Sequence, residues 1–377
     1  MANELLMIAL RWIPATHVGE YVRLAIDDSP TKRYGPQVEG AGIHHNPTPG
    51  PAGSKFLYGH VWVTLSWVVR HPLWSAIGLP LRALMYIRRT DFDTLERQRA
   101  KKPWAFRMKL ELAAELLEWA AGWFTSWLNK PVIAVVDGAY AKRPFLKRAM
   151  AAGVIVVSRL RKDAALCTLP TPVKRRGRGR PRKYAKKRIS LARRGAHRQG
   201  WSVGEFELYG KQTTVTCKTF LATYRPVGGV IRVVLVRDGG AAGCKAFFST
   251  EADLTVSVIL ECVADRSAIE QNFHDVKEVE GAGQQQLRNV FSNVAAWHLC
   301  LWLHTLVELW SWRRGGNRLK QRADRPWDDG DRRPSHAGRL KTLRREAIRE
   351  TFSALPRRPG AASKIWTLLK HLTQLAA

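Results

Sequence analysis

The sequence predicts an α/β protein in which one mixed β-sheet is flanked by helices. Two observations favour this class. Apolar runs with strand character alternate with a long segment of helical periodicity, and two of these runs lead directly into carboxylates. A further group of β-patterned runs late in the chain predicts a β-rich insertion before the last helices. The chain has 377 residues, 45% of them hydrophobic, so it can bury a sizeable core.

Three strands are expected in the first quarter of the chain. Residues 21–28 (YVRLAIDD) alternate with period 2 and end in two acids. Residues 56–70 and 73–88 are rich in aromatic and β-branched residues, and His71 and Pro72 separate them. The three runs predict a meander whose first connection is a long loop rich in Gly and Pro.

A long amphipathic helix is expected next, because apolar residues recur at helical spacing from Phe106 to Leu128. Residues 131–137 (PVIAVVD) form an apolar run typical of a strand that is buried on both faces. A helix over about residues 143–152 and a buried strand, GVIVVSRL, follow. The order β-β-β-α-β-α-β is that of an RNase H-like domain, with acids at the ends of its first and fourth strands.

Composition divides the chain further. Residues 1–158 are expected to form the first part of the RNase H-like catalytic domain. Residues 159–200, with sixteen Lys or Arg against one acid, are expected to be a basic arm. Residues 201–263 return to a β pattern and would be the insertion. Residues 264–312 would be the C-terminal helices of the catalytic domain, and residues 313–377 a basic helical tail.

The charge balance indicates a polyanionic partner. The chain has 62 Lys and Arg against 31 Asp and Glu, a formal net charge of +31, which would destabilise the fold through self-repulsion without counter-charge. Nucleic acid is the expected partner, and a merely basic protein or one that faces an anionic membrane surface is the lesser alternative. No signal peptide and no membrane span is expected. Five widely spaced cysteines without a CxxC pair fit a reducing cytoplasm and small core residues.

Three carboxylates are candidate catalytic and metal-binding residues: Asp28, Asp137 and Glu270. Asp28 shares the strand face that carries the core residues of its strand, and Asp27 is the alternative for the first position. Carboxylates that converge without a cation raise one another's pKa, so the set favours a divalent metal. Hard oxygen ligands favour Mg²⁺ or Mn²⁺, and two such ions suit phosphodiester cleavage.

The helix RSAIEQNFHDVK carries Arg266, Glu270 after three intervening residues and Lys277 after six more. This spacing resembles the Arg-x3-Glu-x6-Lys core of the Tyr/Arg/Glu/Lys signature of bacterial insertion-sequence DDE transposases. VVDGAY and LAIDDSP look like the second and first catalytic segments of that group. The small hydroxyl residue Ser29 follows Asp28 as in the group's pattern, which favours Asp28 over Asp27 for the first position. The resemblance implies that Asp28, Asp137 and Glu270 bind the metal, and that Arg266 and Lys277 contact DNA near the transposon end.

By this resemblance the protein would be a cut-and-paste transposase that cleaves and joins DNA at the ends of an insertion sequence. Its partners would be the transposon ends and the target DNA, with a homodimer in the DNA complex. Two features depart from the pattern: Val263 occupies the tyrosine position, and the first acid comes early, so an N-terminally truncated frame is one interpretation. An RNase H-like nuclease without strand transfer and a catalytically idle DNA-binding remnant are the alternatives.

Further DNA contacts are expected in the basic arm, where RGRGRPRK resembles the Arg-Gly-Arg-Pro core of minor-groove AT-hooks. A nonspecific phosphate-binding arm is the stronger interpretation. Trp201 is a candidate platform for a flipped base, as in relatives that form DNA hairpins, although a core Trp at an insertion boundary is the stronger interpretation. The arm residues concerned are Arg176, Arg178, Arg180, Arg182 and Lys183.

Overall fold

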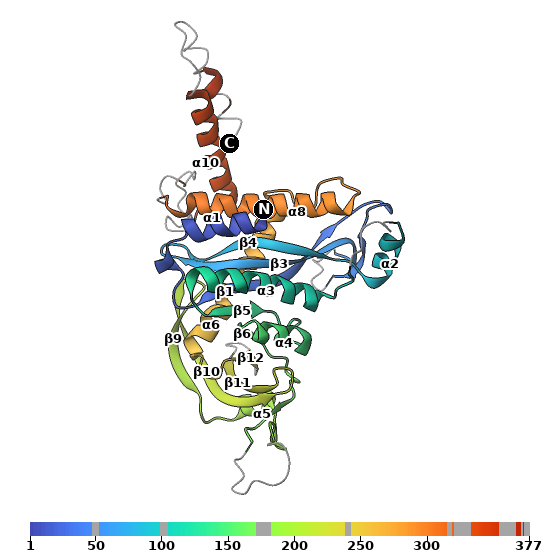
Figure 1. Ribbon diagram of the computed structural model, residues 1–377. Helices are drawn as coiled ribbons and strands as arrows, with labels where there is room; N and C mark the ends of the chain where they lie inside the picture. Colours follow the sequence, from blue (N-terminus) through green and yellow to red (C-terminus); the bar gives the residue numbers. More distant parts are fainter. Residues whose placement is uncertain are drawn as a thin grey trace.

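A computed structural model of the chain shows one mixed sheet of twelve strands with helices on both of its faces (Figure 1). The strands follow the order β2-β3-β1-β5-β6-β12-β11-β10-β7-β8, while β4 pairs with β3 and β9 pairs with β10. The structure describes residues 1–46, 53–98, 105–170, 182–237, 243–314, 319, 333–353, 367–370 and 372.

The first part of the sheet confirms the predicted fold class. β1, β3 and β4 form an antiparallel meander, and β5 and β6 continue from β1 as parallel strands. Across this part the order is therefore β4-β3-β1-β5-β6, the RNase H-like order. The strands are β1 (Val22–Lys32), β2 (Gly42–His45), β3 (Phe56–His71), β4 (Ser75–Tyr86), β5 (Val132–Val136) and β6 (Ile155–Arg159).

Two helices cover one face of these strands. α3 (Lys109–Leu128) buries Phe124 in the core, as its apolar periodicity predicts. It ends where Asn129 adopts the left-handed conformation with a φ of 48°. α4 (Arg143–Ala151) has Pro144 in its first turn, where the missing N–H leaves no hydrogen bond unmade. The smaller helices of the N-terminal half are α1 (Ala2–Trp12), the 3-10 turn η1 (Ala15–His17) and α2 (Arg89–Gln98).

The β-rich insertion continues the same sheet. β12 pairs with β6 in antiparallel fashion, with Phe247 opposite Arg159, and β11, β10 and β9 follow outward as antiparallel neighbours. The backbone ladder is therefore unbroken from the predicted catalytic strands into the insertion. Its long strands are β9 (Ser202–Leu208), β10 (Lys211–Tyr224), β11 (Gly229–Arg237) and β12 (Cys244–Ser249).

Besides α1, η1, β2 and α2, the expected arm and the expected β-rich segment also contain elements that the sequence patterns did not predict. The expected arm, residues 159–200, holds β7 (Leu166–Cys167), β8 (Arg188–Ile189) and α5 (Leu191–Ala196), while its residues 171–181 lie outside the described residues. The expected β-rich segment ends in a helix, α6 (Val256–Asp265). Thr255 caps this helix, because its hydroxyl accepts a hydrogen bond of 3.3 Å from the backbone N–H of Val258.

The C-terminal helices pack on the other face of the sheet and beyond its edge. α7 and α8 both contact β4, and α1 contacts α8. α10 projects from this layer away from the sheet (Figure 1). The elements are α7 (Ser267–Glu278), α8 (Val290–Trp312) and α10 (His336–Ser353).

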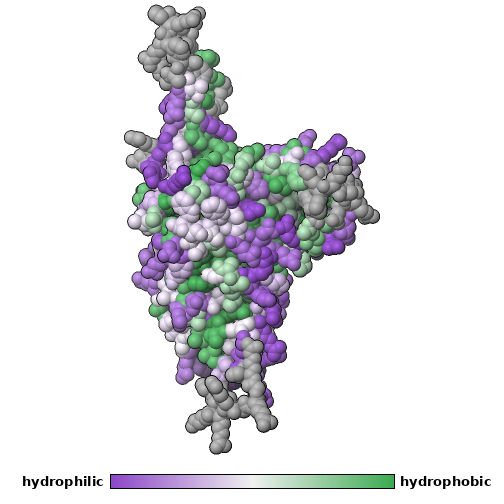
Figure 2. All heavy atoms as spheres, in the orientation of Figure 1, coloured by the Kyte–Doolittle hydropathy of each residue, from purple (hydrophilic) through white to green (hydrophobic). Residues whose placement is uncertain are grey.

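Among the described helices, α8 is the one whose length and apolar composition would allow it to cross a membrane. Its inner side packs on β4, and it carries His304 and Glu308 in buried positions. Its outer side exposes Leu299, Leu303 and Leu306. Figure 2 shows hydrophobic side chains gathered over this outer layer.

Both faces of the sheet are buried, and the residues of a strand alternate between them. Leu24 and Ile26 of β1 belong to the large core that also contains Phe124 of α3. Ala25, between them, packs with Ile269 of α7 in a separate cluster on the opposite face. Burial alone therefore does not tell which face of β1 carries a functional side chain.

Candidate active site

Asp27 and Asp137 lie on neighbouring strands. β1 and β5 run parallel, with Ile26 opposite Val136. Asp27 follows Ile26 and Asp137 follows Val136, so the two acids lie at the same level of the sheet. Alternation places Asp27 on the same face as Ala25, which is the face that α7 covers. Asp137 follows β5 directly, at the carboxyl end of the strand.

Arg266 joins these acids to Glu270. Its Nη1 donates a hydrogen bond of 2.7 Å to Oδ2 of Asp27, and its Nη2 donates one of 3.0 Å to Oε1 of Glu270. Burial alone would lower the pKa of the guanidinium, but the carboxylates of Asp27, Glu270 and Asp137 together raise it. Asp27 of β1 and Glu270 of α7 therefore share one guanidinium. Asp137, directly after the neighbouring strand, adds to the negative charge around it.

The electrostatics of this group favour an additional cation. Burial raises the pKa of Asp27, and the neighbouring Arg266 only partly opposes that effect. The side chain of Glu270 is 62% exposed, so the group is open to solvent on its α7 side. The donor set consists of carboxylate oxygens, which are the ligands that Mg²⁺ and Mn²⁺ prefer.

Asp28 lies on the opposite face of the sheet from Glu270. Oδ2 of Asp28 accepts a hydrogen bond of 2.7 Å from Lys109 Nζ at the start of α3, and Oδ1 accepts one of 2.6 Å from the hydroxyl of Tyr140. β1 also continues past the two acids to Lys32 instead of ending at Asp28. One of the two reasons for preferring Asp28 was that it shares a face with core residues, and this reason does not separate it from Asp27 because both faces are buried. The other reason, the hydroxyl residue Ser29 that follows Asp28, stays a prediction from the resemblance.

The two expected DNA-contacting residues of α7 have different environments. Arg266 is engaged by Asp27 and Glu270, as described above. Lys277 lies two turns after Glu270, and burial lowers the pKa of its ammonium. Within the described part of the chain no hydrogen bond or ion pair to this ammonium is found, so it can receive an anionic ligand.

Trp201 is half-buried at the start of the insertion. Its indole N–H donates a hydrogen bond of 3.0 Å to the backbone oxygen of His197. The ammonium of Lys218 lies 4.8 Å from the ring centroid, and the guanidinium carbon of Arg237 lies 4.7 Å from it. Two cationic side chains therefore already lie against the ring of Trp201.

The structure describes two of the five expected DNA-contacting residues of the arm. Arg182 and Lys183 are exposed, whereas Arg176, Arg178 and Arg180 lie outside the described residues.

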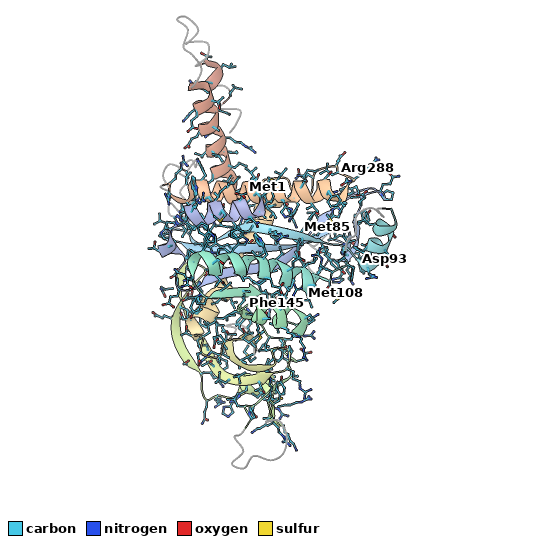
Figure 3. All side chains as sticks on the ribbon, in the orientation of Figure 1. Met1, Met85, Asp93, Met108, Phe145 and Arg288 are labelled. Carbon is cyan, nitrogen blue, oxygen red and sulfur yellow. The ribbon has the colours of Figure 1, made fainter. Side chains whose placement is uncertain are left out.

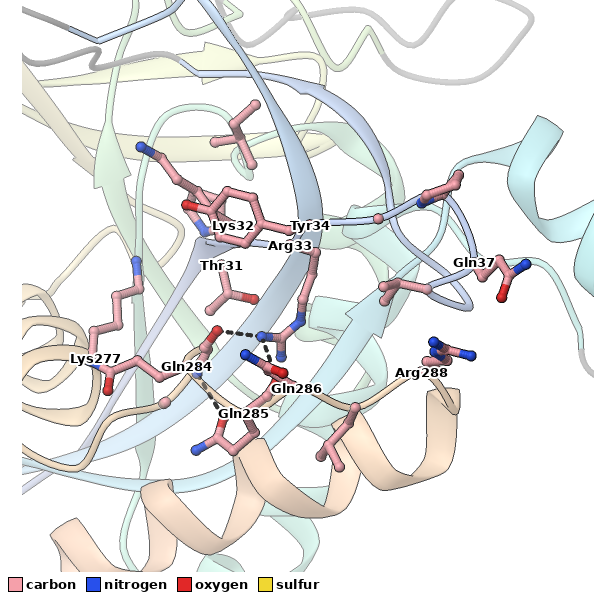
Figure 4. Close-up of a pocket in the computed structure, with 18 of the residues that line it drawn as sticks. Thr31, Lys32, Arg33, Tyr34, Gln37, Lys277, Gln284, Gln285, Gln286 and Arg288 are labelled. Atoms are coloured by element: carbon pink, nitrogen blue, oxygen red, sulfur yellow. Dashed lines mark hydrogen bonds between the residues drawn. The ribbon is translucent and has the colours of Figure 1, made fainter.

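A groove lies farther along β1 and α7 than Asp27 and Glu270. Its volume is about 1200 Å³, and β1 beyond Asp27 forms one wall, while the end of α7 and the loop before α8 form the other. Figure 4 shows Lys32, Lys277 and Arg288 on its walls together with a run of three glutamines. Figure 3 places Arg288 at the end of the molecule that also carries Asp93 of α2.

A second polar cluster, which the sequence did not indicate, lies between α7, α8 and α10. Asp275, His304 and His336 each offer a ligand atom within 4.8 Å of the others, and all three residues are buried. Both ring nitrogens of His336 are already bonded to carboxylates, with Nδ1 3.0 Å from Glu308 and Nε2 2.8 Å from Glu280. No local motif signals this cluster, because its residues come from three helices far apart in sequence.

The charges of this second cluster are balanced by the chain itself. Glu308 is fully buried, and its carboxylate accepts hydrogen bonds from both Arg333 and Arg339 at 2.6 Å. Asp275 and Glu270 are five residues apart on α7, so their side chains leave the helix about 140° apart. The cluster is thus separate from the group around Arg266, and it ties α10 to the body.

The strand order and the flanking helices define the class of the protein, an α/β protein with an RNase H-like fold. A family model described as DDE superfamily endonuclease matches residues 2–219, more than half of the chain. The chain belongs to the DDE superfamily of endonucleases. It is accordingly a nuclease with DNA as its substrate, and endonucleases of this superfamily use divalent metal ions.

Other comparisons add little. No curated protein matches the chain. Among solved structures it is similar to the NurA nuclease from Sulfolobus solfataricus, at 9% identity and a TM-score of 0.26, over 71% of this chain and 82% of that one. A likeness of this size carries no conclusion about function. The family match includes Asp27 and Asp137 but ends before α7, so the assignment of Glu270 rests on its contacts.

Proposed function

We propose that the protein is a transposase that cleaves and joins DNA strands at the ends of an insertion sequence, with Asp27, Asp137 and Glu270 as its catalytic, metal-binding acids. The observation that supports this assignment is the pair of hydrogen bonds by which Arg266 joins Asp27 to Glu270, with Asp137 directly after the strand that pairs with β1. In the proposal Asp27 takes the first position, for which Asp28 was the initial expectation. Asp28 instead connects β1 to Lys109 and Tyr140.

The residues present suit two divalent ions. The three carboxylates would supply hard oxygen ligands, and two of them, Asp27 and Glu270, already pair with one positive charge. Two Mg²⁺ or Mn²⁺ ions bound there would activate the attacking oxygen and stabilise the leaving oxygen of an in-line displacement. Because Glu270 is largely exposed, DNA can reach this group from the side of α7.

The chain's own residues would position the DNA. Arg266 holds Asp27 and Glu270 in a fixed relation, which reduces the reorganisation needed when substrate binds. Lys277, with no acid bonded to it among the described residues, is placed to bind a phosphate of the strand that enters from the groove. The net charge of +31 supports binding to a long polyanion.

Strand transfer is the finer part of the proposal, and a homodimer on the DNA belongs to it. Joining two transposon ends at one target calls for two copies of the catalytic group. The exposed leucines on the outer side of α8 offer an apolar surface suited to a protein contact. The alternatives are a nuclease of the same fold without strand transfer, and a DNA-binding remnant without catalysis.

The test uses a supercoiled plasmid that carries the coding segment with its natural flanking DNA, incubated with Mg²⁺, Mn²⁺, Ca²⁺ or EDTA. A transposase is expected to nick at both flanks with Mg²⁺ or Mn²⁺ and to yield products in which the freed 3′ end is joined to a second DNA. Nicks without joined products would identify the nuclease alternative. Binding without any nick would identify the remnant, and cleavage in EDTA would overturn the metal-dependent mechanism.

A further inference from the structure

The groove between β1 and the loop that follows α7 carries positive charge on both walls. Lys32 lies on the β1 wall, while Lys277 and Arg288 lie on the opposite wall. Among the described lining residues the single acid is Glu278. Pro30, at the near end of the groove, is three residues beyond Asp27 on β1. A DNA strand whose phosphate lies at the acids would reach this groove by following β1 from Asp27 and α7 from Glu270.

The loop between α7 and α8 is held rigidly against β1. Gln285 turns inward, where its side-chain oxygen accepts a hydrogen bond of 3.0 Å from the N–H of Gly283 and its amide donates one of 2.9 Å to the oxygen of Gly281. Arg33 of the β1 wall is buried and donates hydrogen bonds to the backbone oxygens of Gly283 and Gln285. The loop is thus fixed by its own side chain and by one buried guanidinium.

Gly283 sets how closely the loop approaches β1. Its φ is +98°, a conformation that favours glycine, and a Cβ built at this position would lie 3.1 Å from the side chain of Thr31. No larger residue fits this position without moving the loop or the strand. The close approach keeps the loop's side chains in a constant position relative to the acids on β1.

The two glutamines that flank Gln285 are exposed in the groove. Gln284 and Gln286 both line it, and both are solvent-exposed, whereas Gln285 between them is half-buried in the loop. A primary amide presents a donor and an acceptor side by side. This pair matches the N6 and N7 edge of adenine in the major groove, which Gln and Asn recognise with two hydrogen bonds.

We propose that this groove is a base-reading subsite, in which Gln284 and Gln286 recognise adenine in the DNA next to the scissile phosphate while Lys32, Lys277 and Arg288 hold its backbone. The inference rests on the proposed function, because it assumes that a phosphodiester is bound at the acids. It goes further in naming where sequence is read and which base is preferred. Phosphate contacts position the duplex, and amide contacts supply the specificity.

The experiment is an in-vitro selection from duplex DNA with a randomised segment, made with Ca²⁺ in place of Mg²⁺ so that binding is scored without cleavage. The wild type is expected to enrich a motif that contains adenine. In the Gln284→Ala/Gln286→Ala double variant, the enrichment of adenine over the other bases is expected to fall about tenfold, which is the scale of one good bidentate contact. Arg288→Ala is expected to weaken binding to all sequences alike, because it removes a backbone contact.

A matched control is Gln212→Ala, which removes an exposed glutamine from β10 in the insertion and should leave the motif unchanged. Melting temperatures of all variants are measured first, so that an unfolded variant is recognised. The inference is overturned if the wild type enriches no adenine-containing motif, or if the double variant keeps the same motif at full strength.

The two proposals fail separately. If the motif depends on the glutamines but no nicking ever occurs, the groove inference stands and the transposase proposal fails. If metal-dependent nicking and joining occur while the glutamines have no effect on the motif, the transposase proposal stands and the groove inference fails.

Discussion

The hydroxyl of Tyr140 donates a hydrogen bond of 2.6 Å to Oδ1 of Asp28. Burial together with the charge of Asp28 raises the pKa of Tyr140 well above its ordinary value, so the phenol remains a donor. The bond links the middle of β1 to the segment that follows β5, and Lys109 extends the link to α3. It gives Asp28 a structural task on the face of the sheet opposite Glu270.

The first prediction compares the adjacent acids. Asp27→Asn is expected to lower metal-dependent nicking by at least about a hundredfold, because it removes a proposed metal ligand. Asp28→Asn is expected to retain nicking and to lower the free energy of unfolding by about 1–2 kcal/mol, since it weakens the bonds to Tyr140 and Lys109. Nicking rates and urea unfolding of both variants check this. A folded but inactive Asp28→Asn protein would return the first position to Asp28.

The second prediction concerns Glu270. Glu270→Gln is expected to abolish both nicking and joining while leaving DNA affinity within about twofold, because phosphate contacts come from Lys and Arg. Its side chain is 62% exposed, so the free energy of unfolding should change by less than about 0.5 kcal/mol. Glu350→Gln, an exposed change on α10, is the matched control. Full activity in Glu270→Gln would remove this residue from the mechanism.

The third prediction is a strong salt dependence of DNA binding. If about eight phosphates are neutralised, the slope of the logarithm of the binding constant against the logarithm of salt concentration should be near −7. Lys277→Ala should reduce the magnitude of that slope by about 1, because one phosphate contact is lost. Titrations at several salt concentrations measure both slopes. A flat response, or an unchanged slope in Lys277→Ala, would contradict the assignment of phosphate contacts.

The fourth prediction concerns the buried cluster under α10. Burial alone would lower the pKa of His336, but its hydrogen bonds to Glu280 and Glu308 outweigh that effect and raise the pKa above its ordinary value of 6.5. The charge of Arg339 opposes this rise, and the ring of His304 stacks on that of His336 with centroids 4.2 Å apart.

A raised folded-state pKa stabilises the fold fully below pH 6.5, and this contribution is lost as the pH rises through the folded-state value. His336→Gln is therefore expected to be less stable than the wild type by about 1.5–3 kcal/mol near pH 6, with a gap that narrows as the pH rises above 6.5 and through the raised folded-state pKa. Denaturant unfolding across this range is the measurement. A gap independent of pH would mean that His336 is not protonated in the fold.

Much of the fold could be predicted because its signals are local. The alternation in residues 21–28, the helical spacing from Phe106 to Leu128 and the apolar run before Asp137 each specify an element within one short segment. α6 was not predicted, because a short apolar run suits a strand as well as a buried helix. In the structure Thr255 caps the N-terminus of this run, which favours the helix.

The site could be predicted only in part. That acids at two adjacent strands would meet follows from the strand order. Which of Asp27 and Asp28 faces Glu270 depends on which face of the sheet α7 covers, a contact between segments about 240 residues apart. The groove glutamines and the cluster around His336 were not predicted for the same reason, because only tertiary packing brings their residues together.

The hydrogen bonds between β12 and β6 have a consequence for the motions of the molecule. The chain leaves β6 to build the insertion and returns to the same strand through β12, so the insertion cannot swing on a hinge without breaking its ladder. In amide hydrogen exchange, β5, β6, β12 and β11 should therefore open together as one cooperative unit. DNA bound to the insertion would then keep a fixed position relative to β5, the strand that leads into Asp137.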